Sequence, residues 1–570
     1  MSVRRPNEHP IGIGIYDDHD GGVAAVRNGK VLLYCEFERM TRLKYQTGLF
    51  PEIVEELLRQ LPLDEVSAIS IPHPNLITKL LLDRFDAVLE SANEVSVSGN
   101  KIKILNQDNI HPLLHVLAIL PLQNIHLGVY AVLVFDAGQP KMGWVDLRTP
   151  LQSIPDLHLM SLSEEKWYNG AIFADFFGTI FYGSPNLRNS GKLMGLASWG
   201  KTKLQYVKRL SELAEKHFDP ATNIWEGYQS IAKDDLQTEI RKLIGTDSWE
   251  HEHSTVLDLA SSAQELFSHK LVEQVVAGLK EVRHEIDKAN ISAPIGLLYG
   301  GGCGLSVVTN SRIREAIDLP LIVPPYTNDS SQFLGAAIFA SMYNAQQPLP
   351  LGVGWDNIPR HTVGIVSAAD IEKAGLRARP ACTEEVAERI ISGELIALID
   401  GASEAGPRAL GMRSLLANAL DPEMRWWINS RVKMREWYRP FAPALPADDF
   451  MEYFREPSTE LATYMLDSFS IIPHYRSLLT AVSSPDGTSR PQAVYSHQNP
   501  WYYDLLKTLG SLTGHPVVLN TSLNAPGLPI AFDLSQSLKD CEVLGIDAAV
   551  ISGMLLERDA IMQGVKNASK

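Results

Sequence analysis

The chain has 570 residues, of which 45% are hydrophobic and 21% are charged, with 51 Lys and Arg against 67 Asp and Glu. This length exceeds one domain and predicts several compact units or two large ones. The formal net charge of −16 argues against a general nucleic-acid or membrane-surface binder, because both functions need a broad positive field. We therefore expect no nucleic acid and no membrane among its partners, while a local basic pocket is compatible with this charge.

The cysteines and the N-terminal residues exclude further classes of protein. Four widely separated cysteines form no CxxC pair, so neither a zinc knuckle nor a disulfide framework is indicated. The N-terminal residues contain no apolar signal-peptide core, and the most apolar stretch, Leu113–Phe135, is interrupted by polar residues and by Pro121. We expect a soluble, cytoplasmic, multi-domain protein.

Taken in chain order, the first unit shows apolar runs that end in polar or glycine turns. Asn28-Gly29 stands between two short apolar runs and predicts a hairpin. Strands that end in such turns, with helical patterns between them, predict a mostly buried sheet of an α/β fold. The strand-like runs are Ile11–Tyr16, Ala131–Gly138 and Ile295–Gly304, and the helical patterns are Pro51–Gln60, Val256–Ile286 and Leu334–Asn344.

A change in composition suggests where two large units meet. Residues 346–359 hold three prolines and two glycines without periodicity, which is typical of a linker. This divides the chain into residues 1–345 and 360–570. The second unit then begins with a helix near Thr383–Ser392 and a strand over Leu395–Leu398.

Four residues of the first unit are candidate metal ligands. His111 and His115 are four residues apart, which places both imidazoles on one helical face. Asp136 ends an apolar strand, and Asp329 precedes a helix. Two imidazoles and two carboxylates suit iron(II), manganese or zinc, and magnesium less well. The structural alternatives are a turn residue for Asp136 and a helix N-cap for Asp329.

Glycine-rich turns in the same unit are candidates for contact with a nucleotide. Gly300–Gly302 follows a strand, and such a turn lets backbone amides approach a phosphate. Lys192 stands in the glycine-bounded segment GKLMGLASWG, which is otherwise a surface turn. Together with the turns after Tyr16 and Phe135, these features suggest the actin/hexokinase superfold.

The second unit carries a local excess of basic residues. Between Asp400 and Phe441 seven basic residues face five acidic ones, among prolines, glycines and tryptophans that indicate a structured pocket. Arginine matches phosphate oxygens in a bidentate manner and lysine acts as a point charge, so a small polyanion such as ATP fits this stretch. Arg490 in DGTSRPQ and Ser522 in NTSLN stand in turn-rich contexts typical of ligand loops.

These motifs carry a family resemblance. The segments HDGGVAAVRNGKVLLYCEFERMTRLK, HPLLH, VLVFDAG, GKLMGLASWG, GGGCGLSVVTN, GPRALGMRS, NSRVKMREWYRPFAPALP, DGTSRPQ and GHPVVLNTSLNAPGLPI follow one another from Ile11 to about Leu556. In this order they resemble the antibiotic and nodulation-factor O-carbamoyltransferases (nebramycin-type, cephalosporin-type and NodU-like). The resemblance implies an actin/hexokinase-like, Kae1-like N-terminal domain and an α/β, YrdC-like C-terminal domain.

The resemblance also implies a reaction at two sites. Carbamoyl phosphate and ATP would give carbamoyl-adenylate in the YrdC-like domain, and the carbamoyl group would pass to a hydroxyl of a small natural product in the Kae1-like domain. By motif, the first site would be lined by Arg408, Arg413, Lys433, Arg439, Arg490, Asn520, Ser522 and Asn524. His19 would be the base of the second site, Lys192, Gly301, Gly302 and Asn310 would contact nucleotide, and His111, His115, Asp136 and Asp329 would hold the metal.

The implied cofactors are a divalent metal, Fe²⁺ first with Mn²⁺ or Zn²⁺ as alternatives, and Mg²⁺ with ATP. Two other functions stay open. One is a threonylcarbamoyl-adenylate enzyme of tRNA modification, against which the net charge and the lack of a basic surface run stand. The other is a non-catalytic actin-like ATP-binding module. Neither the acceptor nor the oligomeric state, a homodimer included, follows from the motifs.

Overall fold

The computed structural model describes residues 10–568 except 108, 123, 151–152, 163–168, 185, 218–237, 239, 243–249, 344–347, 353–359 and 458–459. The predicted linker, 346–359, therefore lies mostly outside the described residues. Its described part packs against the first unit, where the Gly352 amide donates to the Leu120 carbonyl at 3.0 Å.

The first sheet has the strand order β3-β2-β1-β4-β7-β6-β5. Strands β1, β2 and β3 are antiparallel neighbours, whereas β1, β4 and β7 run parallel. Asn28 and Gly29, between β2 and β3, both have positive φ angles, which confirms the predicted hairpin turn. The strands are β1 (Ile11–Tyr16), β2 (Gly22–Arg27), β3 (Lys30–Glu36), β4 (Val66–Ile71), β5 (Val88–Ser91), β6 (Glu94–Val97) and β7 (Asn100–Asn106).

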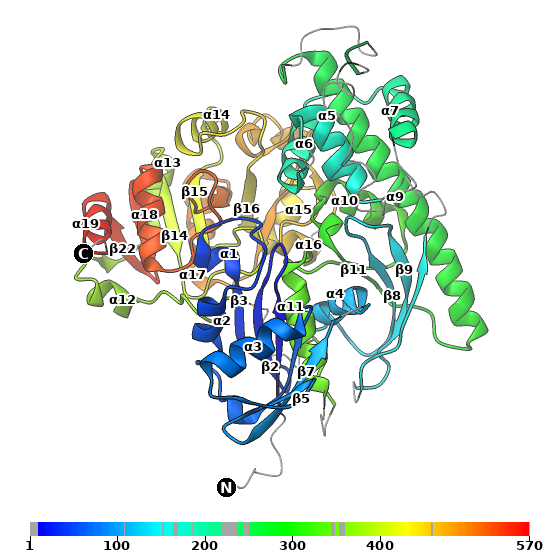
Figure 1. The fold of residues 1–570 in the computed structure, drawn as a ribbon. Coiled ribbons are helices and arrows are strands. Elements are labelled where there is room, and N and C mark those ends of the chain that lie inside the picture. Colours follow the sequence, from blue (N-terminus) through cyan, green and yellow to red (C-terminus); the bar gives the residue numbers. More distant parts are fainter. Residues whose placement is uncertain are drawn as a thin grey trace.

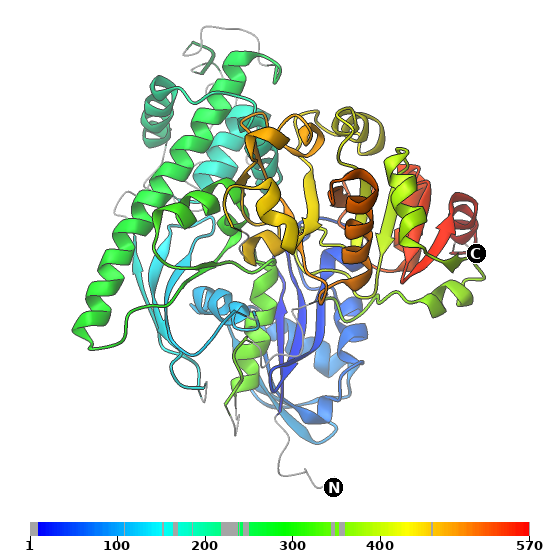
Figure 2. The ribbon, with the colours of Figure 1, turned by 180° about the vertical axis from the view of Figure 1, so that it is seen from behind.

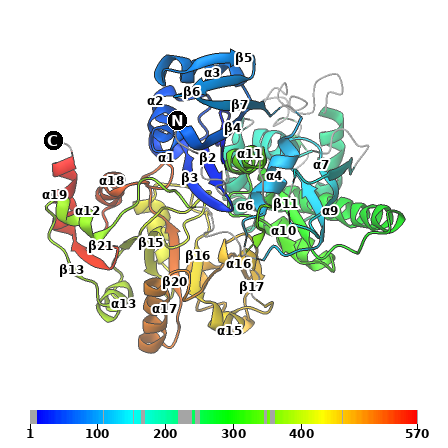
Figure 3. The ribbon, with the colours of Figure 1, turned by 90° about the horizontal axis from the view of Figure 1, so that it is seen from below.

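The second sheet repeats this order as β10-β9-β8-β11-β12, with the same pattern of directions. Its strands are β8 (Val129–Val134), β9 (Lys141–Asp146), β10 (Leu157–Ser161), β11 (Leu297–Gly300) and β12 (Leu321–Ile322). Helices α4 (His111–Ile119) and α11 (Ser330–Met342) lie between the two sheets (Figures 1 and 3). Two such units joined in one body are the actin/hexokinase-like architecture, so that prediction is confirmed.

The central position of α11 follows from its sequence, SSQFLGAAIFASM, which is buried on all sides. Small residues let its backbone approach the first sheet and α4 closely. A Cβ atom on Gly14 would lie 2.0 Å from the Phe333 carbonyl oxygen, and one on Gly335 would lie 2.0 Å from that of Leu114. These glycines allow the loop before α11 to lie beside the start of α4.

The C-terminal part is an α/β domain, as predicted, built on the sheet β13-β22-β21-β14-β15-β20-β16-β19 (Figure 2). The strands are β13 (Arg379–Pro380), β14 (Ile396–Ile399), β15 (Arg413–Asn418), β16 (Ala442–Pro446), β19 (Gln492–Val494), β20 (Val518–Ser522), β21 (Ala548–Ile551) and β22 (Met554–Glu557). A short pair, β17 (Phe469–Ser470) and β18 (Thr488–Ser489), stands apart from it.

Helices cover these sheets. They include α1 (Phe37–Thr41), α2 (Pro51–Leu58), α3 (Pro74–Arg84), α5 (Phe177–Tyr182), α6 (Ser190–Ala197), α7 (Leu204–His217), α9 (Ser254–Lys288), α10 (Val307–Ala316), α12 (Ala368–Lys373), α13 (Thr383–Ile391), α14 (Met424–Trp427), α15 (Phe450–Tyr453), α16 (Glu460–Thr463), α17 (Pro500–Thr513), α18 (Leu534–Leu544) and α19 (Arg558–Ala568). The helices predicted near Pro51, Val256, Leu334 and Thr383 are thereby confirmed. Among the described residues, no helix has the length and apolar character that crossing a membrane requires.

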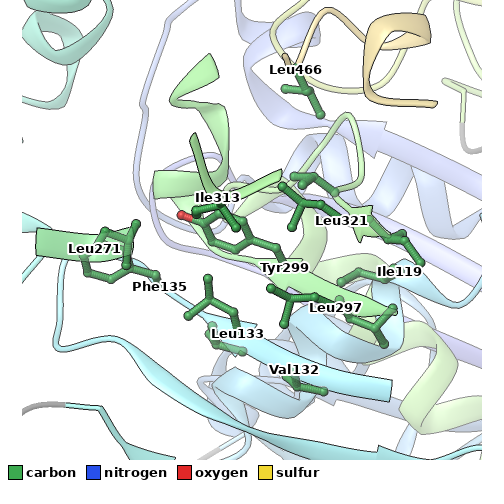
Figure 4. Packing of buried hydrophobic residues seen from close by; sticks show 14 of the residues in the cluster. Ile119, Val132, Leu133, Phe135, Leu271, Leu297, Tyr299, Ile313, Leu321 and Leu466 are labelled. Carbon is green, nitrogen blue, oxygen red and sulfur yellow. The ribbon is translucent and has the colours of Figure 1, made fainter. Parts of the chain in front are cut away.

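The largest hydrophobic core crosses from the first part of the chain to the second. It contains the buried faces of β8 and β11 with residues such as Leu133 and Leu297, and it also contains Tyr438, Tyr464 and Leu466. Figure 4 shows Leu466 above this cluster, entering from the C-terminal domain. Apolar burial therefore fixes the C-terminal domain against the second sheet.

Candidate active site

The four predicted metal ligands converge from three elements. Helix α4 begins at His111, so His115 lies one turn further on the same face. Asp136 stands two residues after β8, and Asp329 directly precedes α11. One ligand atom from each of the four lies within 4.8 Å of the others. The close packing of α11 on β1 and α4 brings together residues that are more than 200 positions apart in the chain.

The distances in this cluster suit a cation. The Nε2 atom of His115 lies 3.4 Å from Asp136 Oδ2 and 3.7 Å from Asp329 Oδ1, and that of His111 lies 3.8 Å from each of these oxygens. The two Nε2 atoms are 3.1 Å apart. Asp136 Oδ2 and Asp329 Oδ1 are buried without a hydrogen-bond partner in the described part of the chain. Carboxylate oxygens without other partners that face two imidazole nitrogens are a donor set that could hold a divalent metal.

Neighbouring groups support that arrangement. The Nδ1 atom of His115 lies 2.7 Å from Ser331 Oγ, a contact that fixes the ring with Nε2 toward the carboxylates. Burial raises the pKa of Asp329, and the negative charge of Asp136 raises it further. The Asp329 side chain does not cap α11, so the N-cap alternative does not account for it.

His19 lies at the edge of the same cluster. Its Nε2 atom is 3.3 Å from Asp329 Oδ2, which also accepts a hydrogen bond from the Tyr16 hydroxyl at 3.1 Å. Burial lowers the pKa of His19, but Asp20 and Asp329 outweigh this effect and raise the pKa to about 10. The imidazole can therefore act as a base only when these carboxylates stabilise its charge less.

The glycine turn borders this cluster through its backbone. Gly301 has a φ angle of +104°, and a Cβ atom on Gly302 would lie 3.0 Å from Asp136 Oδ1. Asn310 does not face it with a free amide, because its Nδ2 atom donates to the carbonyls of Gly304 at 2.7 Å and Leu466 at 2.8 Å. Asn310 thus ties the turn to the C-terminal domain.

Most residues predicted for the first half-reaction line a second site, a cavity of about 520 Å³. Strands β14 and β20 end, and β15, β16 and β19 begin, at one edge of the C-terminal sheet. The loops at that edge carry most of the predicted cavity residues, whereas Lys192 lies on helix α6 of the N-terminal part and not in the surface turn that the sequence suggested. The predicted residues that line it are Lys192, Arg408, Lys433, Arg439, Arg490, Asn520, Ser522 and Asn524.

The basic residues that line the cavity outnumber the acidic residues that line it. Burial lowers the pKa of Arg490 well below its ordinary value, and the charges of Arg408, Arg435 and Arg439 lower it further. Burial also lowers the pKa of Arg408 to about 10. Nε of Arg408, Nε of Arg490 and Nη2 of Arg435 are buried without hydrogen-bond partners among the described residues. Buried, unpaired cations are costly, and an anionic ligand would offset that cost.

Polar contacts order the remaining cavity residues. The Lys433 ammonium donates to the Ser522 carbonyl, and to the Asn524 carbonyl and Oδ1 at 3.0 Å each. The Ser522 hydroxyl donates to the same Oδ1 at 2.6 Å. Asn520 Nδ2 donates to Gln492 Oε1 at 2.7 Å. Lys192 is paired with Glu436 at 2.8 Å, so its charge is already balanced.

The structure places Arg413 outside the cavity. Its side chain is fully buried and donates to the backbone carbonyls of Gly364, Asp400, Gly401, Met412 and Phe532. With all its donors directed at the chain itself, Arg413 organises the loop before β15 and does not contact a ligand there.

Among the described residues, three basic residues that line the cavity were not predicted from the sequence as site residues. Arg435 belongs to the basic stretch that predicted the pocket, so composition alone could have included it. Lys44 and Arg188 come from the N-terminal part of the chain. Only the fold brings them to the C-terminal loops, and no spacing in the sequence indicates it.

Comparisons with known proteins find family matches in both parts of the chain. The family model described as "Carbamoyltransferase N-terminus" matches residues 158–338, and "Carbamoyltransferase C-terminus" matches residues 387–558. The two matches together cover more than half of the chain.

Relatives in the curated proteins carry related names. A nodulation protein NolNO of Sinorhizobium fredii is 26% identical over 95% of this chain and 79% of its own length. A 3'-hydroxymethylcephem-O-carbamoyltransferase of Streptomyces clavuligerus is 28% identical over 66% of each chain. The matched region spans 62% of nodulation protein U of Rhizobium tropici, at 28% identity over 66% of this chain. It spans 28% of an uncharacterised Methanocaldococcus jannaschii protein that is 38% identical over 31% of this chain.

Solved structures resemble the chain only distantly. The activator of 2-hydroxyisocaproyl-CoA dehydratase from Clostridium difficile is 10% identical, with a TM-score of 0.30 over 58% of this chain and 94% of its own. The family is therefore decided by the sequence matches. They include the N-terminal and the C-terminal model of one family. On that basis the chain belongs to the carbamoyltransferase family.

Proposed function

We propose that this chain is an ATP-dependent O-carbamoyltransferase with two reaction sites. Carbamoyl-adenylate forms in the arginine-lined cavity, and the carbamoyl group is transferred to a hydroxyl group beside the His111–His115 cluster. The observation that carries the proposal is the set of buried guanidinium nitrogens that have no hydrogen-bond partner among the described residues, in a cavity large enough for a small polyanion. Membership of the carbamoyltransferase family supports the group transferred.

In the cavity, carbamoyl phosphate is hydrolysed to carbamate and phosphate. A carbamate oxygen then attacks the α-phosphorus of ATP, which enters with Mg²⁺, and the bond to the β-phosphate oxygen breaks to release pyrophosphate. Arg408, Arg439 and Arg490 bind phosphate oxygens, and Lys433 adds a point charge. Each stabilises negative charge that grows in the transition state, so loss of one costs about 10²–10³ in rate.

At the second site, the acceptor hydroxyl oxygen attacks the carbonyl carbon of carbamoyl-adenylate, and AMP leaves with the former anhydride oxygen. His19 accepts the hydroxyl proton, which requires that Asp20 and Asp329 stabilise the imidazolium less than they do here. The backbone of Gly301 and Gly302 lies beside the adenylate. A divalent ion held by the His111–His115–Asp136–Asp329 set, Fe²⁺ first and Mn²⁺ or Zn²⁺ as alternatives, would supply Lewis-acid polarisation there. The name of the cephem relative favours a hydroxyl-bearing small natural product as acceptor.

The test needs no acceptor. Purified protein is mixed with ATP, Mg²⁺ and carbamoyl phosphate, and carbamoyl-adenylate and pyrophosphate are measured by mass spectrometry. We expect both products from the wild type and from Arg84→Ala, which removes an exposed arginine of α3, and neither from Arg490→Ala. Pyrophosphate release that depends on threonine and bicarbonate would contradict the proposal and favour the tRNA-modification enzyme.

A further inference from the structure

Tyr16, the last residue of β1, contacts two of the four candidate metal ligands. Its hydroxyl donates to Asp329 Oδ2 at 3.1 Å, and its ring centroid lies 6.5 Å from that of His111. The residue is buried, with 8% of its surface exposed. No motif in the sequence indicates it, since the first segment that carries the family resemblance begins at His19.

The two carboxylate oxygens of Asp329 have different surroundings. Oδ1 lies 3.7 Å from His115 Nε2 and 3.8 Å from His111 Nε2, and it has no hydrogen-bond partner among the described residues. Oδ2 accepts from the Tyr16 hydroxyl and lies 3.3 Å from His19 Nε2. A carboxylate that is held at one oxygen does not rotate freely, so Asp329 presents the other oxygen to the two imidazoles.

The backbone on both sides of Tyr16 is fixed. Gln107 Nε2 donates to the Ile15 carbonyl at 3.0 Å, and the Gly48 amide donates to the Asp17 carbonyl at 2.7 Å. Tyr16 itself belongs to the paired part of β1 and β2. The sheet therefore sets the position of the phenol, and the hydroxyl is a fixed point to which the Asp329 carboxylate is bound.

Other contacts hold the Asp329 side chain less firmly. The side chain does not cap α11. His19 is a weaker support because 31% of its side chain is exposed, whereas the Tyr16 ring is packed in the largest hydrophobic core. Within the part of the chain that the structure describes, Tyr16 is thus the best-fixed group that binds this carboxylate.

We propose that Tyr16 is a positioning residue of the metal site. Its hydroxyl binds Oδ2 of Asp329 and thereby keeps Oδ1 directed at His111 and His115. A phenol is protonated at neutral pH and donates a hydrogen bond, which suits an ionised carboxylate. Hydrogen bonds to ligating groups orient them, and loss of such a bond lowers metal affinity about 10–100-fold. The inference rests on the proposed function for the divalent metal of this cluster.

The test measures metal affinity in Tyr16→Phe, which removes the hydroxyl and keeps the buried ring. Mn²⁺ is titrated into the full chain without nucleotide, and electron paramagnetic resonance of the free ion gives the Kd. We expect the Kd of Tyr16→Phe to exceed that of the wild type about 10–100-fold. The matched control is Tyr503→Phe, which should bind Mn²⁺ as the wild type does, since the Tyr503 hydroxyl donates to Asp448 Oδ2 at 2.6 Å in the C-terminal domain. His115→Ala gives the background of ions bound elsewhere.

Thermal unfolding of the metal-free proteins separates positioning from folding, and we expect Tyr16→Phe to keep a single transition well above the titration temperature. An unchanged Kd in Tyr16→Phe would overturn the inference, as would an equal rise in Tyr503→Phe or a loss of folded protein that accounts for the weaker binding. If the wild type binds Mn²⁺ but forms no carbamoyl-adenylate, the proposed function fails while the Kd values still decide the role of Tyr16. If the wild type binds no more Mn²⁺ than His115→Ala, the metal assignment fails and the inference fails with it.

Discussion

The buried carboxylate of Glu36 links the stability of this protein to pH. Burial raises the pKa of Glu36, but Arg39, His361 and the Gly406 amide outweigh burial and hold it well below the ordinary value. Arg39 Nε donates to Glu36 Oε2 at 2.9 Å, and the Tyr34 hydroxyl donates to Oε1 at 3.1 Å. The carboxylate therefore stays ionised in the folded state at a pH where the unfolded chain binds a proton.

This difference predicts acid sensitivity. Because the folded-state pKa is lowered, the stabilisation is present above the unfolded pKa of about 4.3 and is lost as the pH falls below it. One such group contributes a slope of up to about 1.4 kcal/mol per pH unit. We expect Glu36→Gln to lower the free energy of unfolding at neutral pH, since Arg39 loses its partner, and to flatten its decrease below pH 4.3. Urea unfolding from pH 3 to 7 measures both, and an unchanged slope would contradict the account.

The sequence predicts the role of a site residue where a motif specifies which chemical groups come together. The sequence suggested that the two histidines and two aspartates form one cluster, and they do converge. Arg413 shares its motif with Arg408, yet its donors bind backbone carbonyls whose positions depend on the fold. The two arginines differ in how deeply their side chains are buried. The residues next to them in the sequence do not encode that difference.

Among the elements, α4 has the clearest functional consequence. It starts at His111, with Pro112 in its first turn, where a missing amide hydrogen costs nothing. The helical repeat then presents His111 and His115 side by side toward Asp136 and Asp329. Two candidate ligands on one turn of a helix would form a rigid half of the proposed metal site.

Removing one of these ligands should therefore remove the metal. After anaerobic loading with Fe²⁺, we expect about one ion per chain in the wild type and in His269→Ala, and far less in His115→Ala. His269 is a suitable control because it lies on α9 and pairs with Glu273 at 3.2 Å. Metal content by plasma mass spectrometry decides the matter, and an equal content in His115→Ala would contradict the assigned ligands.

Elements with strong periodicity or turn chemistry were predictable, including β1, the Asn28-Gly29 hairpin, α2 and α9. The duplication of the two sheets was not, since strand order repeats without a repeat in sequence. Nor were the contacts of α1 and its C-cap predictable, because α1 has only five residues and Arg39 and Arg42 bind the distant Gly406 and Asp540. Short elements held by distant partners carry little local signal.

At the scale of the whole molecule, the chain joins a duplicated actin/hexokinase-like body to an α/β domain through a shared core. The arginine-lined cavity takes residues from both, while the candidate metal ligands, His111, His115, Asp136 and Asp329, belong to the first body alone. Arg39 and Arg42 of the first body bind Gly406 and Asp540 of the C-terminal domain. Separate sites predict that each half-reaction is lost independently of the other.

Exchange of labelled pyrophosphate into ATP, in the presence of carbamoyl phosphate, tests this claim most directly. The exchange reports reversible adenylate formation and needs neither an acceptor nor the metal cluster. We expect exchange in the wild type and in His115→Ala, and a loss of about 10²–10³-fold in Arg408→Ala. Absence of exchange in the wild type, or an equal loss in His115→Ala and Arg408→Ala, would contradict two separate sites.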